Sequence, residues 1–306
     1  MRRAFVEGLA DLADADDRIV LLTGDLGFSV VEGFARRHPK RFINVGVAEQ
    51  NMVGVATGLA EAGFLPFTYS IATFSALRPF EFIRNGPVLH DLPVRIVGIG
   101  GGFEYGTAGY THHAIDDLAV LRTLPRLIVL APADPAQARA ALLATWSRPE
   151  PIYYRLGKDE ETLVPGLDGS FELGSLTKVR DGTDLAIIAT GAIAAEAVAA
   201  ATLLEGLSAE IHIAATISPI ARRGLIDILS RHQTIATVEG HSEVGGLGSL
   251  VLEVAASRGL PNRVVVCGIP PAKAFRNGGE RHLNASVGLT ADRIAARIRK
   301  SMRALH

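Results

Sequence analysis

Cysteine and aromatic residues are scarce in this chain. Cys267 is the only cysteine among 306 residues, and Phe, Trp and Tyr together make up 6%. One thiol cannot build an intrachain disulfide framework, and zinc sites that depend on cysteine need several of them. So few aromatic side chains argue against a β-sandwich or barrel with a core of packed rings. The low aromatic content, together with 32 Gly and 15 Pro that indicate many short turns, favours a layered α/β protein.

Charge is balanced, and long apolar runs are missing. The 31 Lys+Arg against 32 Asp+Glu give a formal charge of −1, without the basic excess that nucleic-acid binding requires. The most apolar stretch, 185–204, is interrupted by Gly191 and Glu196, so it predicts a strand and a helix and not a membrane span. The N-terminal residues begin an amphipathic pattern and not the apolar block of a signal peptide. We therefore expect a soluble, cytoplasmic globular protein without nucleic-acid or membrane partners.

Strand and helix patterns alternate along the first half of the chain. Unbroken apolar runs, as in 19–22 and 96–99, are typical of parallel strands that helices cover on both faces. Strands are expected at 18–23, 42–45, 64–69, 94–99, 127–131 and 152–155, and helices at 30–37, 48–62, 75–90, 116–123 and 135–146. Their alternation predicts a doubly wound, mainly parallel sheet over residues 1–160.

The character of the chain changes after residue 160. Charged residues followed by a Val-Pro-Gly-Leu-Asp-Gly run predict a linker at 161–180. The alternation then restarts, with strands expected at 185–189, 210–214, 234–239 and 264–267, and helices at 192–204, 225–230, 247–257 and 291–304. We predict a second, smaller α/β domain at 181–306.

Four loops after predicted strands carry polar or aromatic side chains. The loops are 23–29, 44–51, 70–74 and 100–113, and they contain Asp25, Glu49, Phe74 and His112 in that order. Ligands of open α/β sheets bind at the carboxyl ends of the strands, so a site is expected here. Taken singly, these residues also have structural explanations: an Asx-turn for Asp25, helix-dipole stabilisation for Glu49 and core packing for Phe74.

Together the loops resemble the transketolase family. The run 41–52 reads Arg-Phe-Ile-Asn-Val-Gly-Val-Ala-Glu-Gln-Asn-Met and is followed by Phe74 and by the Gly-Tyr-Thr-His-His run of 109–113. The chain looks most like the C-terminal half of transketolase and of 1-deoxyxylulose-5-phosphate synthase, encoded as a separate subunit. The resemblance covers nearly the whole chain. It implies a pyrimidine-binding domain followed by a transketolase C-terminal domain, with thiamine diphosphate as cofactor.

The resemblance also assigns the cofactor contacts. Glu49 matches the carboxyl group that hydrogen-bonds N1′ of the aminopyrimidine and favours the tautomer whose N4′ takes the proton from C2 of the thiazolium. Phe74 matches the ring that stacks on the aminopyrimidine. Asp25 and Ile71 are expected beside the cofactor, with Asp25 near a subunit interface. Glu49 and His112 are the expected catalytic residues.

The family holds a sugar phosphate with an Arg, a Ser, a His and a further basic residue. The matching positions are Arg2, Ser29, His112 and Lys158. Lys158 stands where an Arg is usual, so a point charge replaces a bidentate fork. Ala108 stands where transketolase has an Asp that contacts a hydroxyl of the donor sugar. The Lys158 departure argues against tight phosphate recognition, and Ala108 predicts a changed donor stereochemistry or a different sugar.

The diphosphate and Mg²⁺ ligands of the family, a Gly-Asp-Gly followed later by Asn, have no counterpart in this sequence. The segment 24–26 is only superficially similar, and the His112-His113 pair lacks carboxylates or cysteines at metal-ligand spacing. No metal site is predicted on this chain. We expect a separate subunit, corresponding to the N-terminal half of transketolase, to carry the Mg²⁺ and diphosphate ligands in an α2β2 assembly.

The leading hypothesis is a transketolase-type transferase that moves a two-carbon ketol unit from a ketose or ketose phosphate to an aldose. One alternative is the β subunit of a 2-oxoacid dehydrogenase or of a pyruvate-using synthase, which shares the Glu and the two-domain plan. Another is a non-catalytic partner that only scaffolds its companion. The 25–29 loop and His112 favour the ketose interpretation, and the presence of both Glu49 and Phe74 argues against a scaffold.

Overall fold

Seven strands form the first sheet in the computed structural model, which describes residues 1–303. Their order is β10-β5-β6-β4-β3-β1-β2, and all neighbours run parallel except β10, which is antiparallel to β5. The strands are β1 (Ile19–Thr23), β2 (Phe42–Asn44), β3 (Leu65–Ile71), β4 (Arg95–Ile99), β5 (Ile128–Leu130), β6 (Ile152–Leu156) and β10 (Thr216–Ser218). The predicted doubly wound, mainly parallel sheet is confirmed.

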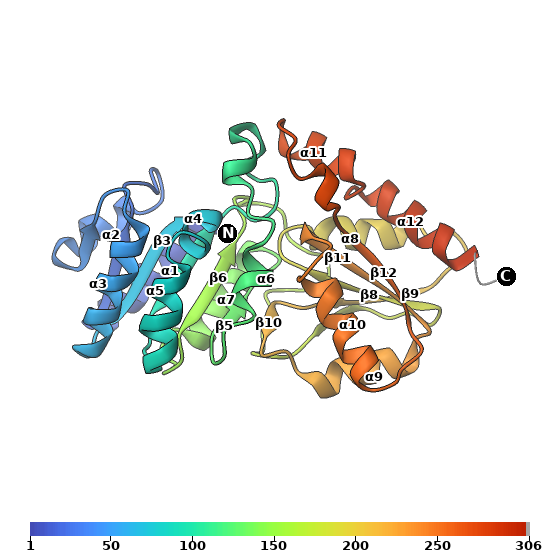
Figure 1. Cartoon of the computed structure of the whole chain (residues 1–306), viewed down its shortest axis with the longest axis horizontal. Coiled ribbons are helices and arrows are strands. Elements are labelled where there is room, and N and C mark those ends of the chain that lie inside the picture. Colours follow the sequence, from blue (N-terminus) through green and yellow to red (C-terminus); the bar gives the residue numbers. More distant parts are fainter. Residues whose placement is uncertain (304–306) are drawn as a thin grey trace.

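Helices cover both faces of this sheet with apolar side chains (Figure 1). One face carries α1 (Arg2–Ala15), α2 (Glu32–Arg37) and α7 (Pro135–Thr145), and the other carries α3 (Glu49–Glu61), α4 (Ala72–Ala76), α5 (Phe80–Ile83) and α6 (Asp117–Leu121). Covered on both sides, the central strands are fully buried, which explains their unbroken apolar sequences. Across residues 1–303, every helix is too short or too polar to cross a bilayer.

The second sheet has five strands in the order β12-β11-β8-β9-β7, parallel except for the edge strand β7. The strands are β7 (Thr177–Arg180), β8 (Leu185–Thr190), β9 (Ala209–Ile213), β11 (Thr234–Ser242) and β12 (Arg263–Ile269). The helices around it are α8 (Ala194–Thr202), α9 (Arg222–Arg231), α10 (Leu247–Ser257), α11 (Glu280–Val287) and α12 (Ala291–Arg303). The end of the segment predicted as a linker, 161–180, therefore contains strand β7.

Strand β10 joins the two halves of the chain. It follows β9 of the second sheet in sequence but pairs with β5 at the edge of the first sheet (Figure 1). One apolar cluster continues across this junction, from Leu22 in β1 to Ile188 in β8 and Val251 in α10. The second domain also supports the loop 100–113, because Gly278 N donates a hydrogen bond to the Gly106 carbonyl at 3.3 Å. The position of that loop therefore depends on both domains.

The prediction of one unbroken helix at 75–90 is wrong. The chain instead forms α4, then α5, and then a π-helical turn at Arg84–Val88. Pro79 lacks an N–H donor and disfavours a helical conformation in the residue before it, and Pro87 lies inside the π-helical turn. The break leaves Arg78 in the connection between α4 and α5. The predicted C-terminal helix is confirmed as far as Arg303, and its predicted last position, 304, lies outside the described residues.

Candidate functional site

Glu49 is the first residue of α3 and lies buried beside the end of β3. Its side chain is 2% exposed. Oε1 accepts a hydrogen bond from the Ser70 hydroxyl at 3.1 Å, and Oε2 accepts one from Arg78 Nη1 at 2.9 Å. A buried carboxylate is costly unless it is hydrogen-bonded and paired in this way. The structure therefore supplies partners for both carboxylate oxygens of Glu49.

Phe74 and His112 lie on the same side of the sheet as Glu49. Phe74, in α4, is partly buried, and its ring centroid lies 5.0 Å from that of His112 in an edge-to-face arrangement. The guanidinium carbon of Arg78 lies 3.8 Å from the centroid of the Phe74 ring. Because the same guanidinium also reaches Glu49, it links the carboxylate to the aromatic ring. The structure thus brings together Glu49, Phe74 and His112.

Lys158 lies beyond His112 along the same surface. Its Nζ donates a hydrogen bond to the Glu104 carbonyl at 3.0 Å and lies 4.1 Å from the centroid of the Tyr105 ring. The Tyr105 ring centroid is 6.4 Å from that of His112. The Thr111 hydroxyl lies 2.9 Å from His112 Nδ1 and so orients the imidazole. The two predicted substrate residues, His112 and Lys158, are therefore separated by a single aromatic ring.

Asp25 and Ser29 lie in the loop after β1, which adjoins Glu49. Both have a positive φ, 58° for Asp25 and 65° for Ser29, which is uncommon outside glycine. Asp25 N donates to Asn44 Oδ1 at 3.1 Å, and Asn44 Nδ2 donates back to Asp25 Oδ1 at 3.1 Å. A Cβ built on Gly24 would lie 3.7 Å from Glu49 Oε1. The two hydrogen bonds with Asn44 therefore hold this loop next to Glu49.

Arg2 and Ile71 have weaker links to these residues. Arg2 Nε donates to Glu160 Oε1 at 3.3 Å, so Arg2 is engaged in an ion pair. Ile71 ends β3, directly after Ser70, and is partly exposed. The substrate role of Arg2 and the cofactor contact of Ile71 both stay predictions.

Two residues at the site, Ser70 and Arg78, were not predicted from the sequence. Arg78 follows Phe74 by four residues, which is the spacing that brings side chains together on one side of a helical turn. That spacing was a usable signal for an Arg beside the ring. Ser70 had no local signal, because its contact with Glu49 joins two elements 21 residues apart.

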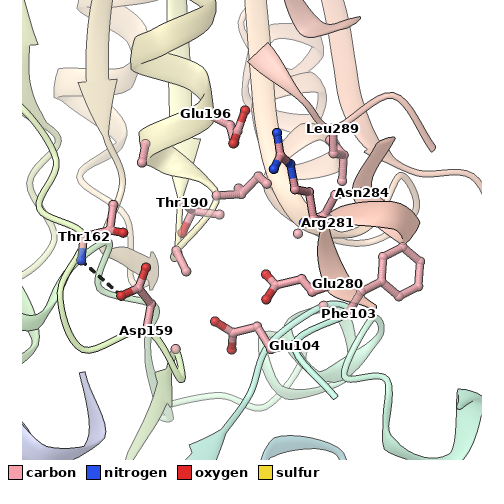
Figure 2. A pocket seen from close by; sticks show the side chains of 18 of the residues that line it. Phe103, Glu104, Asp159, Thr162, Thr190, Glu196, Glu280, Arg281, Asn284 and Leu289 are labelled. Atoms are coloured by element: carbon pink, nitrogen blue, oxygen red, sulfur yellow. Dashed lines mark hydrogen bonds between the residues drawn. The ribbon is translucent and has the colours of Figure 1, made fainter. Parts of the chain in front are cut away.

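A separate cavity of about 300 Å³ lies between the two domains. Figure 2 shows Glu104, from the loop after β4, and Glu280, from α11, projecting toward it from the two domains. Its lining residues do not include Glu49, Phe74 or His112. Burial raises the pKa of the Glu104 carboxyl to about 8, and the nearby Glu280 carboxylate adds to the rise.

Replacing Glu104 by Gln is expected to make stability less dependent on pH. The folded chain keeps a proton on Glu104 up to about pH 8, whereas an unfolded glutamate loses it near pH 4.3. The Glu104 contribution to stability therefore falls as pH rises between these values and stays low above them. The melting temperature of Glu104→Gln should exceed that of the wild type at pH 9 and approach it at pH 5. The exposed Glu205→Gln is the control, and a Glu104→Gln pH profile parallel to the wild type would contradict the assignment.

Family models match the chain over most of its length. Residues 1–161 match the model described as transketolase, pyrimidine binding domain, and residues 174–294 match the model described as transketolase, C-terminal domain. The chain belongs to the transketolase family. This membership confirms the resemblance drawn from the loops, and it implies dependence on thiamine diphosphate.

Individual relatives of the chain are also members of the transketolase family. An apulose-4-phosphate transketolase subunit of Phocaeicola vulgatus is 35% identical, covering 96% of this chain and 94% of that protein. The 1-deoxy-D-xylulose-5-phosphate synthase of Syntrophotalea carbinolica is 36% identical over 97% of this chain but only 47% of that protein. A solved structure described as a split gene transketolase, inactive beta4 tetramer, is 38% identical with a TM-score of 0.89, covering 98% of this chain and 97% of that one. The predicted transketolase-type transferase is confirmed.

Proposed function

We propose that this chain is the C-terminal-half subunit of a two-chain transketolase. In this proposal the enzyme transfers a two-carbon ketol unit from a ketose phosphate to an aldose, with thiamine diphosphate bound between this chain and an N-terminal-half subunit. The observation that carries the proposal is the pairing of Glu49 with Phe74. A buried carboxylate and a partly exposed aromatic ring lie close enough for one planar group to contact both.

The residues present fit the aminopyrimidine end of the cofactor. The guanidinium of Arg78 is a planar group that carries nitrogen atoms. Its Nη1 donates a hydrogen bond to Glu49 Oε2 at 2.9 Å, and its central carbon lies 3.8 Å from the centroid of the Phe74 ring. An aminopyrimidine has the same planarity and offers a ring nitrogen to the carboxyl group. Glu49 would hold a proton at N1′, and Phe74 would fix the ring by stacking. When bound, the cofactor supplies the acidic carbon and the electron sink that carbon–carbon cleavage requires.

The surface that continues from Phe74 would bind the sugar. His112, oriented by Thr111, would hydrogen-bond a substrate oxygen and exchange a proton with it. Lys158 would provide one positive charge for the phosphate, and Ser29 and Arg2 would also bind the phosphate. Ala108 offers no side-chain acceptor to a donor hydroxyl. The name of the Phocaeicola vulgatus relative, an apulose-4-phosphate transketolase subunit, supports a phosphorylated and unusual ketose as donor.

The partner subunit would hold the Mg²⁺ and the diphosphate. Within residues 1–303, no group of three or more His, Cys, Asp or Glu side chains is arranged to hold a metal ion. One relative is named as a single subunit of its transketolase, and another is a split-gene transketolase whose beta4 tetramer is inactive. Both names support a division of the active site between two chains. We propose an α2β2 assembly.

A donor screen with the assembled pair tests this function. The chain is co-purified with the product of the neighbouring gene and is assayed with thiamine diphosphate, Mg²⁺ and a set of ketose phosphates, free ketoses and pyruvate. We expect turnover with at least one ketose phosphate and its loss when thiamine diphosphate is omitted. Turnover with pyruvate alone would instead favour a 2-oxoacid enzyme, and turnover that does not depend on the cofactor would overturn the proposal.

A further inference from the structure

Arg78 bridges the two side chains that the proposed function assigns to the aminopyrimidine. Its Nη1 donates to Glu49 Oε2 at 2.9 Å, and its guanidinium carbon lies 3.8 Å from the centroid of the Phe74 ring. The Arg78 side chain is 45% exposed, whereas that of Glu49 is 2% exposed. Arg78 therefore reaches the buried carboxylate from the solvent side, across one face of Phe74.

The backbone of Arg78 is held, while its side chain keeps an open route to solvent. Gln50 follows Glu49 in α3, and its Nε2 donates a hydrogen bond to the Arg78 carbonyl at 3.2 Å. Pro79 directly follows Arg78 in the chain. These contacts fix where the side chain starts. The guanidinium itself has one hydrogen-bond acceptor among residues 1–303, the Glu49 carboxylate. A change of side-chain rotamer would thus release the guanidinium without moving the strand ends that carry the site.

The two contacts of Arg78 stabilise the site as it stands. A guanidinium beside a buried carboxylate offsets part of the cost of burying that charge. A cation stacked on a phenyl ring is attracted by the negative charge on the face of the ring. However, the proposed function gives a ring nitrogen of the cofactor the same carboxyl group. A planar group that bonds Glu49 Oε2 while stacking on Phe74, as the guanidinium does, would lie over the same face of the ring. Two planar groups cannot both lie at about stacking distance on one face of one ring.

We infer that Arg78 is a positioning residue that competes with the aminopyrimidine for Glu49 and Phe74. Cofactor binding displaces the guanidinium from the ring face, and this displacement lowers the apparent affinity for the cofactor. Until then Arg78 keeps the Glu49 carboxylate paired and the Phe74 ring covered. This inference rests on the proposed function, because it takes from that function the group that Arg78 opposes.

Cofactor affinity of the assembled pair tests the competition. Thiamine diphosphate is titrated calorimetrically, at saturating Mg²⁺, into pairs containing the wild-type chain, Arg78→Ala or Arg78→Gln. Without the competing guanidinium, both variants are expected to bind about tenfold more tightly. Arg84→Ala is the matched control. The side chain of this exposed Arg in the same segment hydrogen-bonds only Asn85 within residues 1–303, and the variant pair should bind thiamine diphosphate as tightly as the wild type.

Weaker or unchanged binding by both Arg78 variants would overturn the inference, since it would mean that Arg78 supports the bound cofactor or does not meet it. A wild-type pair that binds no thiamine diphosphate would overturn the proposed function, and the inference with it. These two failures are distinguished by the wild-type titration alone.

Thermal unfolding of the chain by itself provides a readout that needs neither partner nor cofactor. Arg78→Gln should lower the melting temperature when Glu49 is present and should have little effect in a Glu49→Gln background, because the lost pairing involves that carboxylate. Arg78→Gln keeps a hydrogen-bond donor, so folding should persist even if Arg78→Ala is too unstable to purify. Equal effects in both backgrounds would show that the two residues are not paired and would overturn the inference.

Discussion

Glu49→Gln is expected to reduce kcat of the assembled enzyme by about 10²- to 10⁴-fold, the usual contribution of a positioned acid–base group. Gln has nearly the same shape as Glu, and its amide oxygen can still accept a hydrogen bond from Ser70. It cannot hold and release a proton at N1′ of the aminopyrimidine. The loss should therefore fall on the chemical step, with the structure of the site retained.

Two comparisons separate this loss from a general defect. Glu61→Gln changes an exposed glutamate at the other end of the same helix, α3, and should leave kcat unchanged. Circular dichroism and gel filtration of Glu49→Gln should match the wild type, which would exclude misfolding as the cause. If kcat fell by less than about tenfold, smaller than a typical acid–base contribution, the catalytic assignment of Glu49 would fail. The non-catalytic scaffold would then become the better interpretation.

The sequence predicted the elements whose signal is local. Strand β4 was expected at 94–99 and is observed at Arg95–Ile99, and helix α3 was expected at 48–62 and is observed at Glu49–Glu61. The segment 94–99 contains an apolar run of strand length, and 48–62 has the length of a helix, so both signals are local. The short strands β7 and β10 have three or four residues each and no such periodicity. Strand β10 exists because it pairs with β5, more than 80 residues earlier, which no local pattern records.

The residues of the candidate site also fall into those with a sequence signal and those that depend on tertiary contacts. Glu49, Phe74 and His112 were predicted as site residues from a family motif, and the structure places them together. The motif did not reveal Ser70 or Arg78, because their roles depend on tertiary contacts between α3, the end of β3 and the turn after α4. Pro79 was visible in the sequence and should have ended the predicted helix. That break is what leaves Arg78 free to turn toward Glu49.

This chain alone is expected to show no two-carbon transfer, with activity appearing only when the N-terminal-half subunit is added. Glu49 and Phe74 form one wall of the proposed cofactor site, and no metal-holding cluster occurs within the part of the chain that the structure describes. A diphosphate with its Mg²⁺ needs carboxylate, carbonyl or amide oxygens around the ion. In the proposed function, the second polypeptide supplies those ligands.

The loops on either side of Glu49 offer a surface for that second polypeptide. Phe28, after β1, is 79% exposed, and Val47, before α3, is 71% exposed. We expect these two exposed apolar side chains, which flank the proposed site, to contact the partner chain. Replacing both by Ser is expected to weaken association with the partner chain about tenfold or more, the size expected when buried anchors are lost. Leu143→Ser, at a 47% exposed position near the end of α7, is the matched control.

Titration of the partner chain into a fixed amount of this one measures both effects. Activity should rise from zero and saturate at an equimolar ratio, and light scattering at that point should give the mass of an α2β2 assembly. The Phe28→Ser and Val47→Ser double variant should reach the same maximum only at higher partner concentration, because its own wall of the site is intact. Cofactor-dependent turnover by this chain without any partner would refute the divided site, whatever its oligomeric state.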